Sequence, residues 1–261
     1  MASIRALGLD SGSTTTKIVG VSEDGSLAWH RLEDADPVAD AQARRLVAAA
    51  REEAGNPTVP VVATGYGRKL VGDADRAVTE ITAHARGVFR QLAQAGTLVD
   101  IGGQDSKVIR VGPRGNVLDF AMNDKCAAGT GRFLENTAAR LRVPLEELDA
   151  TALSGTEETA ISSTCTVFAE SEIISLLARG TPLAPILRGL HRALVRRVAA
   201  MVRAVGIDGP VFLSGGVARN RAVQVMLAAE LGVPGVVVPE HPQLMGAYGA
   251  ALVALERATG G

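Results

Sequence analysis

The same arrangement of residues occurs twice in this chain and limits the folds that the chain can adopt. In each copy a short apolar run predicts a strand, an acidic and glycine-rich turn follows, and a second apolar run predicts another strand. The first copy is centred on Leu9-Asp-Ser-Gly-Ser13 and the second on Val99-Asp-Ile-Gly-Gly103. An internal repeat of this kind predicts two similar lobes, each of which presents its turn to a shared cleft.

Strand-like runs alternate with helix-like runs along the chain, which predicts an α/β fold. We expect a first lobe over residues 1–95 and a second over residues 96–261, with a C-terminal helix at 244–258 that packs back on the first lobe. Strands are predicted over residues 4–9, 17–21, 27–32, 59–64, 97–101, 108–111, 117–122, 160–162, 211–213 and 236–238. Helices are predicted over residues 38–54, 79–94, 130–141, 167–178, 183–205, 222–231 and 244–258.

The bulk composition excludes several classes of function. The formal net charge of the 261 residues is −1, so there is no basic excess for a nucleic acid. No apolar run approaches the roughly 18 residues of a membrane span, and the N-terminus leads directly into a strand without a signal-peptide pattern. We therefore expect a cytoplasmic protein that binds neither nucleic acid nor membrane.

Both acidic turns have the composition of phosphate-binding loops, because small residues expose backbone N–H groups and hydroxyls to an anion. A strand rather than a helix follows each turn, so neither is the common P-loop, and an ordinary polar hairpin is the alternative. The predicted nucleotide-binding residues are Asp10, Gly12, Ser13, Thr14, Thr15 and Lys17 in the first turn, and Gly102, Gly103, Gln104, Asp105 and Lys107 in the second.

A third glycine-rich segment, Ser214–Asn220, follows a predicted strand and precedes a helix. A strand, two glycines and a helix in this order allow the backbone to approach a nucleotide closely. Gly215, Gly216 and Asn220 are therefore further candidate nucleotide contacts.

The chain has two cysteines, and each stands just before a predicted helix. The N-terminal end of a helix favours a thiolate. Two thiolates do not fill the four positions of a usual iron–sulfur cluster, but a symmetric dimer would supply four. Cys126 and Cys165 are thus either ligands of a metal centre on a two-fold axis or two inert core cysteines; the polar, glycine-rich surroundings of Cys126 are not typical of a core.

Taken together, the three glycine-rich segments resemble those of the actin, sugar-kinase and heat-shock-chaperone ATPase superfamily. Within it the chain is similar to the ATP-dependent activators of 2-hydroxyacyl-CoA dehydratases, which are related to the ATP-binding subunits of benzoyl-CoA reductase. The resemblance runs from Leu7 to about Leu252. Its most specific residues are Asp100-Ile-Gly-Gly-Gln-Asp-Ser-Lys107, Asn123-Asp-Lys-Cys-Ala-Ala-Gly-Thr-Gly-Arg132, Cys165-Thr-Val-Phe-Ala-Glu-Ser-Glu172 and Ser214-Gly-Gly-Val-Ala-Arg-Asn220.

The resemblance implies a homodimer that shares one [4Fe–4S] cluster, held by Cys126 and Cys165 of each subunit. It also implies ATP hydrolysis that drives a low-potential electron to a dehydratase-type iron–sulfur protein, with ferredoxin or flavodoxin as the electron donor. We expect Asp10 and Asp100 to hold Mg²⁺ through water and Gln104 to position the attacking water. Asp100 and Gln104 are the predicted catalytic residues, Lys17 and Lys107 would neutralise phosphate charge, and Gly129 is a further candidate nucleotide contact.

The sequence also allows other functions. The same architecture would serve as the ATP-dependent reductase component for benzoyl-CoA reduction or for a double-cubane cluster protein, in place of a dehydratase. In another class, a sugar-kinase-like phosphotransferase or a chaperone-like assembly module would use the same nucleotide turns without redox chemistry.

Overall fold

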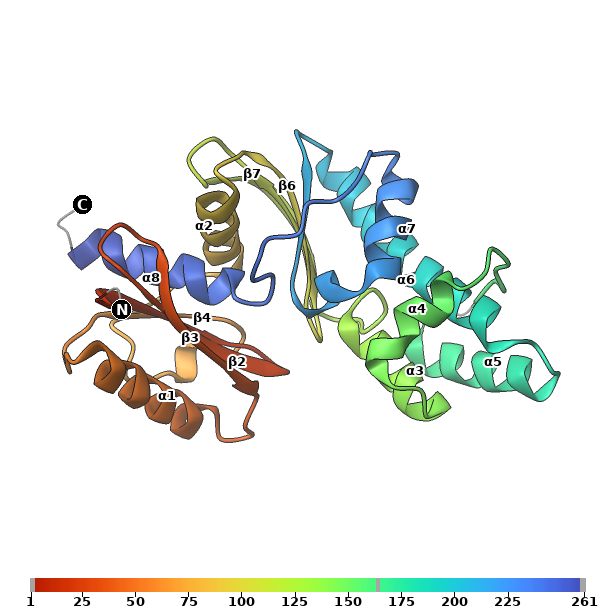
Figure 1. Ribbon diagram of the computed structural model, residues 1–261, viewed down its shortest axis with the longest axis horizontal. Coiled ribbons are helices and arrows are strands. Elements are labelled where there is room, and N and C mark those ends of the chain that lie inside the picture. Colours follow the sequence, from red (N-terminus) through yellow and green to blue (C-terminus); the bar gives the residue numbers. More distant parts are fainter. Residues whose placement is uncertain (1–2, 163–164, 259–261) are drawn as a thin grey trace. The chain divides into compact units, whose positions relative to one another are not determined.

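The computed structural model describes residues 3–162 and 165–258. The chain divides into two compact units (Figure 1). The first unit comprises Met1–Ala95, Val111–Leu118 and Gln243–Gly261, and the second comprises Gly96–Arg110 and Asp119–Pro242. Within the described ranges no helix combines the length and the apolar character that crossing a membrane requires.

The first unit is built on a five-stranded sheet in the order β3-β2-β1-β4-β5. β1 pairs antiparallel with β2, which pairs antiparallel with β3, whereas β1–β4 and β4–β5 are parallel. A turn at Asp24-Gly25 joins β2 to β3, and the positive φ of Gly25 (78°) explains the glycine. The strands are β1 (Ala6–Ser11), β2 (Thr15–Val21), β3 (Leu27–Asp34), β4 (Val61–Thr64) and β5 (Arg76–Ala77).

Helices cover both faces of this sheet (Figure 1). Leu7 and Leu9 share a core with α1 (Ala39–Ala54). Gly8 faces the opposite way, because neighbouring strand residues alternate between faces; a Cβ on Gly8 would lie 2.0 Å from the carbonyl oxygen of Ala247 in α8 (Met245–Ala258). The absence of a side chain at Gly8 therefore lets α8 lie directly on β1.

The helix α2 (Glu80–Leu92) begins close to the predicted residue 79. Thr79 caps it, since Oγ1 of Thr79 accepts a hydrogen bond from the N–H of Thr82. α2 packs tightly against α8, since a Cβ on Gly249 would lie 1.7 Å from the carbonyl oxygen of Ala83.

The second unit is built on a four-stranded sheet in the order β8-β7-β6-β9, in which β6 and β9 are parallel. A parallel bridge between Phe212 and Val237 adds one more pairing beyond β9. The strands are β6 (Gly96–Ile101), β7 (Ser106–Val111), β8 (Val117–Asn123) and β9 (Val211–Ser214).

The long helix α6 (Leu183–Val205) organises the core of the second unit. Ile186, Leu190, Leu194 and Val198 are fully buried or nearly so at helical spacing, and they pack in one apolar cluster with the sheet. The other helices of this unit are α3 (Gly131–Leu141), α4 (Leu148–Leu153), α5 (Thr166–Ala178) and α7 (Arg221–Leu231).

Two predicted strands were wrong, and one helix was missed. Residues 160–162 form no strand; the segment before them packs on α6 instead, since the N–H of Thr159 donates to the carbonyl of Pro185. Residues 236–238 contribute a single bridge at Val237 rather than a strand. The helix α4 was not predicted, although its buried Leu148 and Ala152 are four residues apart, as on one helix face.

Candidate functional site

The first acidic turn brings Asp10, Gly12 and Lys17 together. Asp10 and Lys17 are directly opposite each other in the β1–β2 ladder, and Nζ of Lys17 lies 3.4 Å from Oδ2 of Asp10. A Cβ on Gly12 would lie 2.7 Å from the carbonyl oxygen of Thr15, so only glycine fits there. Oγ1 of Thr14 is buried without a hydrogen-bond partner in the described part of the chain. The turn therefore has a hydroxyl available for a ligand, with a cation beside it.

Asp10 also lies against segments that sequence reasoning did not assign to the site. A Cβ on Gly65, whose φ is 92°, would lie 2.5 Å from Oδ1 of Asp10. A Cβ on Gly246 would lie 3.0 Å from Oδ2 of Asp10 and 2.8 Å from Nε2 of His84, which is buried. The sequence signals that were missed are the Gly65-Tyr-Gly67 turn and the glycine at the start of α8.

The second acidic turn places three predicted residues in one buried charge network. Nζ of Lys107 lies 3.4 Å from Oδ2 of Asp100 and 2.7 Å from Oδ2 of Asp105, and the lysine side chain is only 2 % exposed. The other oxygen of Asp100, Oδ1, accepts a hydrogen bond of 2.6 Å from Oγ of Ser214. Lys107 therefore neutralises the carboxylates of its own turn, and any water-mediated Mg²⁺ contact of Asp100 would form beside this cation.

The predicted catalytic residue Gln104 has a different environment. It is exposed at the tip of the second turn, and its side chain forms no hydrogen bond to residues 3–162 or 165–258. The structure thus leaves this side chain accessible, and the water-positioning role of Gln104 stays a prediction.

The second turn is hydrogen-bonded to the start of α3. The N–H of Gly131 donates to the carbonyl of Gly102, and the N–H of Arg132 donates to that of Gly103, both at 2.8 Å. The first N–H groups of a helix have no partner inside the helix, and these two are satisfied by the turn. The turn of Asp100 and Gln104 is thus fixed to the helix that follows Cys126.

In the Ser214–Asn220 segment, Gly215 and Asn220 both make contacts that support the local fold. Gly215 has a φ of 88°, and a Cβ on it would lie 2.2 Å from the carbonyl oxygen of Ile101. Oδ1 of Asn220 caps α7 by accepting from the N–H of Val223, and its Nδ2 donates to Nε2 of His191 at 3.0 Å. Both ends of the Asn220 amide are therefore engaged within the chain, and the nucleotide contact of this segment stays a prediction.

The buried His191 supports this cap. Its Nδ1 lies 2.7 Å from the carbonyl of Leu187 and so carries the proton, which leaves Nε2 to accept from Asn220. Burial lowers the pKa of His191, outweighing its hydrogen bonds to Leu187 and Asn220. The ring is therefore neutral near pH 7, which is the state that the cap needs.

The two cysteines lie in the second unit, in different settings. Cys126 is half-buried in a loop that Asn123 shapes: Nδ2 of Asn123 donates to the carbonyls of Cys126 and Ala128, at 2.8 and 3.2 Å. Cys165 is exposed and is the residue immediately before α5. Both thiols are free. No three His, Cys, Asp or Glu residues gather as a metal site in the part of the chain that the structure describes.

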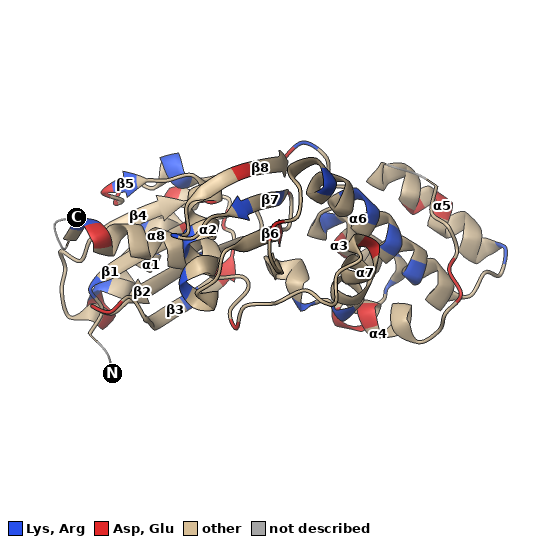
Figure 2. Cartoon of the chain, turned by 90° about the horizontal axis from the view of Figure 1, so that it is seen from above, with Lys and Arg blue, Asp and Glu red and all other residues tan. Residues whose placement is uncertain are grey.

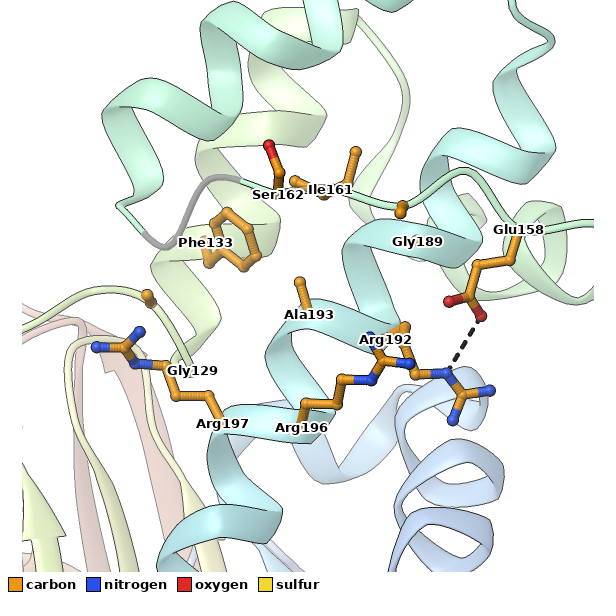
Figure 3. A pocket seen from close by; sticks show the side chains of 12 residues that line it. Gly129, Phe133, Glu158, Ile161, Ser162, Gly189, Arg192, Ala193, Arg196 and Arg197 are labelled. Carbon is orange, nitrogen blue, oxygen red and sulfur yellow. Dashed lines mark hydrogen bonds and ion pairs between the residues drawn. The ribbon is translucent and has the colours of Figure 1, made fainter.

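A cavity of about 310 Å³ opens beside the Cys126 loop (Figure 3). Apolar side chains form part of its wall, and arginines from α6 form another part; basic residues continue along this helix (Figure 2). Arg192 is paired with Glu158 at 3.1 Å. The lining also includes Gly129, Phe133, Ile161, Arg196 and Arg197.

Comparison with known proteins identifies the family. A model of the BadF/BadG/BcrA/BcrD ATPase family matches residues 7–254. This chain belongs to that family. Among curated relatives, the family member described as the activator of lactoyl-CoA dehydratase from Anaerotignum propionicum is 40 % identical over 257 residues, covering 97 % of this chain and 98 % of the relative.

Two solved structures are similar over nearly their whole length. Component A of the (R)-2-hydroxyglutaryl-CoA dehydratase of Acidaminococcus fermentans has a TM-score of 0.91 at 41 % identity, covering 98 % of this chain and 100 % of that one. The activator of the 2-hydroxyisocaproyl-CoA dehydratase of Clostridium difficile, with bound ADPNP, has a TM-score of 0.88 at 38 % identity. The match covers 97 % of this chain and 95 % of the activator. The family resemblance inferred from the sequence is confirmed.

A more distant structure confirms the predicted fold class. A ROK family glucokinase from Streptomyces griseus has a TM-score of 0.60 at 15 % identity, covering 96 % of this chain and 99 % of the glucokinase. This likeness shows the actin-like, sugar-kinase-like fold and nothing about a shared substrate.

Proposed function

We propose that this chain is the ATP-hydrolysing activator of an iron–sulfur enzyme of the 2-hydroxyacyl-CoA dehydratase class. Two full-length relatives carry activator names, and the solved activator from Clostridium difficile binds ADPNP. In this proposal the chain works in the cytoplasm as a homodimer and passes single electrons from ferredoxin or flavodoxin to the dehydratase.

ATP binding would use the two acidic turns and the backbone of the Ser214–Asn220 segment. The unpartnered hydroxyl of Thr14 and the cation of Lys17 fit an anionic ligand at the first turn. Asp10 and Asp100 would hold Mg²⁺ through water, and Gln104 would orient the water that attacks the γ-phosphate. Hydrolysis breaks the bond between the γ-phosphorus and its bridging oxygen and yields ADP and phosphate.

The cysteines fit a [4Fe–4S] cluster shared by two subunits. Each chain supplies two free thiols, one half-buried and one exposed, so a symmetric pair supplies the four that such a cluster uses. Val167 and Phe168, next to Cys165, are 68 % and 69 % exposed, which fits a surface that a second subunit covers. When bound, the cluster would hold the low-potential electron that the dehydratase receives.

The observation that carries this proposal is the pair of hydrogen bonds from α3 to the second turn. Gly131 and Arg132 donate to the carbonyls of Gly102 and Gly103. A change of the turn on loss of the γ-phosphate therefore moves the N-terminus of α3, and with it the loop of Cys126. Two discrete arrangements of this linked element would be biased by ATP and by ADP.

Reconstitution with a dehydratase tests the proposal. The protein, purified without oxygen, is mixed with a 2-hydroxyacyl-CoA dehydratase, its substrate and dithionite, with ATP or with ADP. We expect dehydration with ATP only, and loss of both hydrolysis and activation in Asp100→Asn. ATP hydrolysis that activates no dehydratase, with phosphate transferred to a sugar instead, would show a phosphotransferase.

A further inference from the structure

One arginine of α6 reaches a cysteine of the proposed cluster. Nη2 of Arg197 lies 3.6 Å from Sγ of Cys126, within the distance at which an N–H donates to sulfur. A guanidinium has only donors, so the sulfur is the acceptor in this contact. A positive hydrogen-bond donor thus faces one of the two sulfur atoms that the chain supplies.

The local fold holds this arginine in place. The stem of Arg197 runs past Gly129 (Figure 3): a Cβ on Gly129 would lie 3.4 to 3.6 Å from the Cβ, Cγ and Cδ atoms of Arg197. Gly129 has a φ of 88°, a conformation that favours glycine. The Cys126 loop turns at Gly129 and passes over the stem, while the two hydrogen bonds from Asn123 hold the loop itself.

The neighbouring positions lack this contact. Arg196 is exposed and forms no hydrogen bond to any residue that the structure describes, although its charge helps to lower the pKa of Glu230. Cys165 is exposed at the start of α5, and its sulfur accepts no hydrogen bond from the described residues. Within the described chain, Cys126 therefore differs from Cys165 because an arginine donates to its sulfur. Arg197 differs from Arg196 because it contacts a cysteine.

We propose that Arg197 is a positioning residue that hydrogen-bonds to the ligand sulfur of Cys126 and sets the reduction potential of the cluster. This inference rests on the proposed function. One-electron reduction adds one negative charge to the cluster and its four thiolates, and a positive donor at a ligand sulfur stabilises that added charge. Two symmetry-related arginines, one from each subunit, would act on the shared cluster and raise its potential.

The test compares Arg197→Gln and Arg197→Lys with Arg196→Gln, which removes the same charge one residue away without touching sulfur. Iron per dimer is counted after anaerobic reconstitution. The midpoint potential is then measured by a redox titration with dithionite, followed by electron paramagnetic resonance, with ADP bound. Unfolding curves of the iron-free proteins show whether each variant is folded.

We expect Arg197→Gln to hold the same iron as the unaltered protein at a more negative potential. Arg197→Lys should lie between the two, and Arg196→Gln should match the unaltered protein. A folded Arg197→Gln protein that alone fails to hold iron would overturn the potential-setting role, since it would show that the contact with Cys126 only holds the ligand loop. Equal potentials in Arg197→Gln and Arg196→Gln would overturn the inference. Absence of iron from the unaltered protein would instead overturn the proposed function.

Discussion

Nζ of Lys107 lies 3.4 Å from Oδ2 of Asp100, and the equivalent lysine of the first turn, Lys17, lies at the same distance from Oδ2 of Asp10. The repeat in the sequence is therefore also a repeat of an ion pair. The pairs differ in burial, because the side chain of Lys107 is 2 % exposed and that of Lys17 is 14 % exposed.

Replacing Lys107 by methionine should destabilise the protein strongly. The substitution leaves Asp100 buried without its cation, and such a loss costs about 3–5 kcal/mol. The free energy of unfolding, measured in denaturant, should fall by about that amount. Lys17→Met is the matched control and should cost less, since Asp10 and Lys17 are reached by more solvent. Equal losses in the two variants would show that burial does not set the strength of these pairs.

The stability of the protein should depend on the protonation of His191. Its folded-state pKa is lowered by burial, so below an unfolded-state value of about 6.5 the unfolded chain binds a proton that the folded chain does not. Above that pH, His191 makes its full contribution to the free energy of unfolding. As the pH drops below it, this contribution falls by at most about 1.4 kcal/mol per pH unit.

His191→Gln removes this dependence. The difference in unfolding free energy between the unaltered protein and the variant should therefore narrow between pH 7.5 and pH 5.5. A difference that stays constant over this range would contradict a neutral, buried His191.

Gly131→Ala should weaken the link between ATP hydrolysis and electron transfer. A Cβ at Gly131 would lie 3.1 Å from the carbonyl oxygen of Gly102, so α3 must move away from the turn by a few tenths of an ångström. We expect the hydrolysis rate to change little and the electrons delivered per ATP to fall several-fold. A fall in both quantities by the same factor would argue against α3 as the connection.

The packing of α8 on α2 should not tolerate a methyl group at Gly249. The added Cβ would lie 1.7 Å from the carbonyl oxygen of Ala83, so the helices must separate, and overpacking of this kind costs about 1–3 kcal/mol or more. Gly155→Ala is the control, since no atom beyond Gly155 and its two chain neighbours lies within 4 Å of its Cβ position; its effect should stay within about 0.5 kcal/mol. Thermal unfolding of the two variants compares them directly.

Most of the strands and both acidic turns were predictable from the sequence because their signals are local. Leu7 and Leu9 alternate with Gly8, and the pair of turns repeats with the same residue types. The start of a helix near residue 79 was likewise predictable, because an apolar-periodic run begins there. Patterns of this kind depend on neighbouring residues only.

The contacts around the turns were not predictable, because they join residues that are distant in sequence. Gly246 and His84 approach Asp10 only after α8 and α2 pack together, and Ser214 reaches Asp100 through the parallel pairing of β6 and β9. Arg197 is one of several arginines along α6, and periodicity alone does not show which of them meets Cys126.

Iron and acid-labile sulfide per dimer, counted after strictly anaerobic purification, decide whether two copies of this chain share a cluster. We expect about four irons per dimer, lost in Cys126→Ser and in Cys165→Ser while both variants remain folded and bind ATP. A dimer that holds no iron under these conditions, and whose ATP hydrolysis is unchanged in both variants, would show that the cysteines hold no shared cluster.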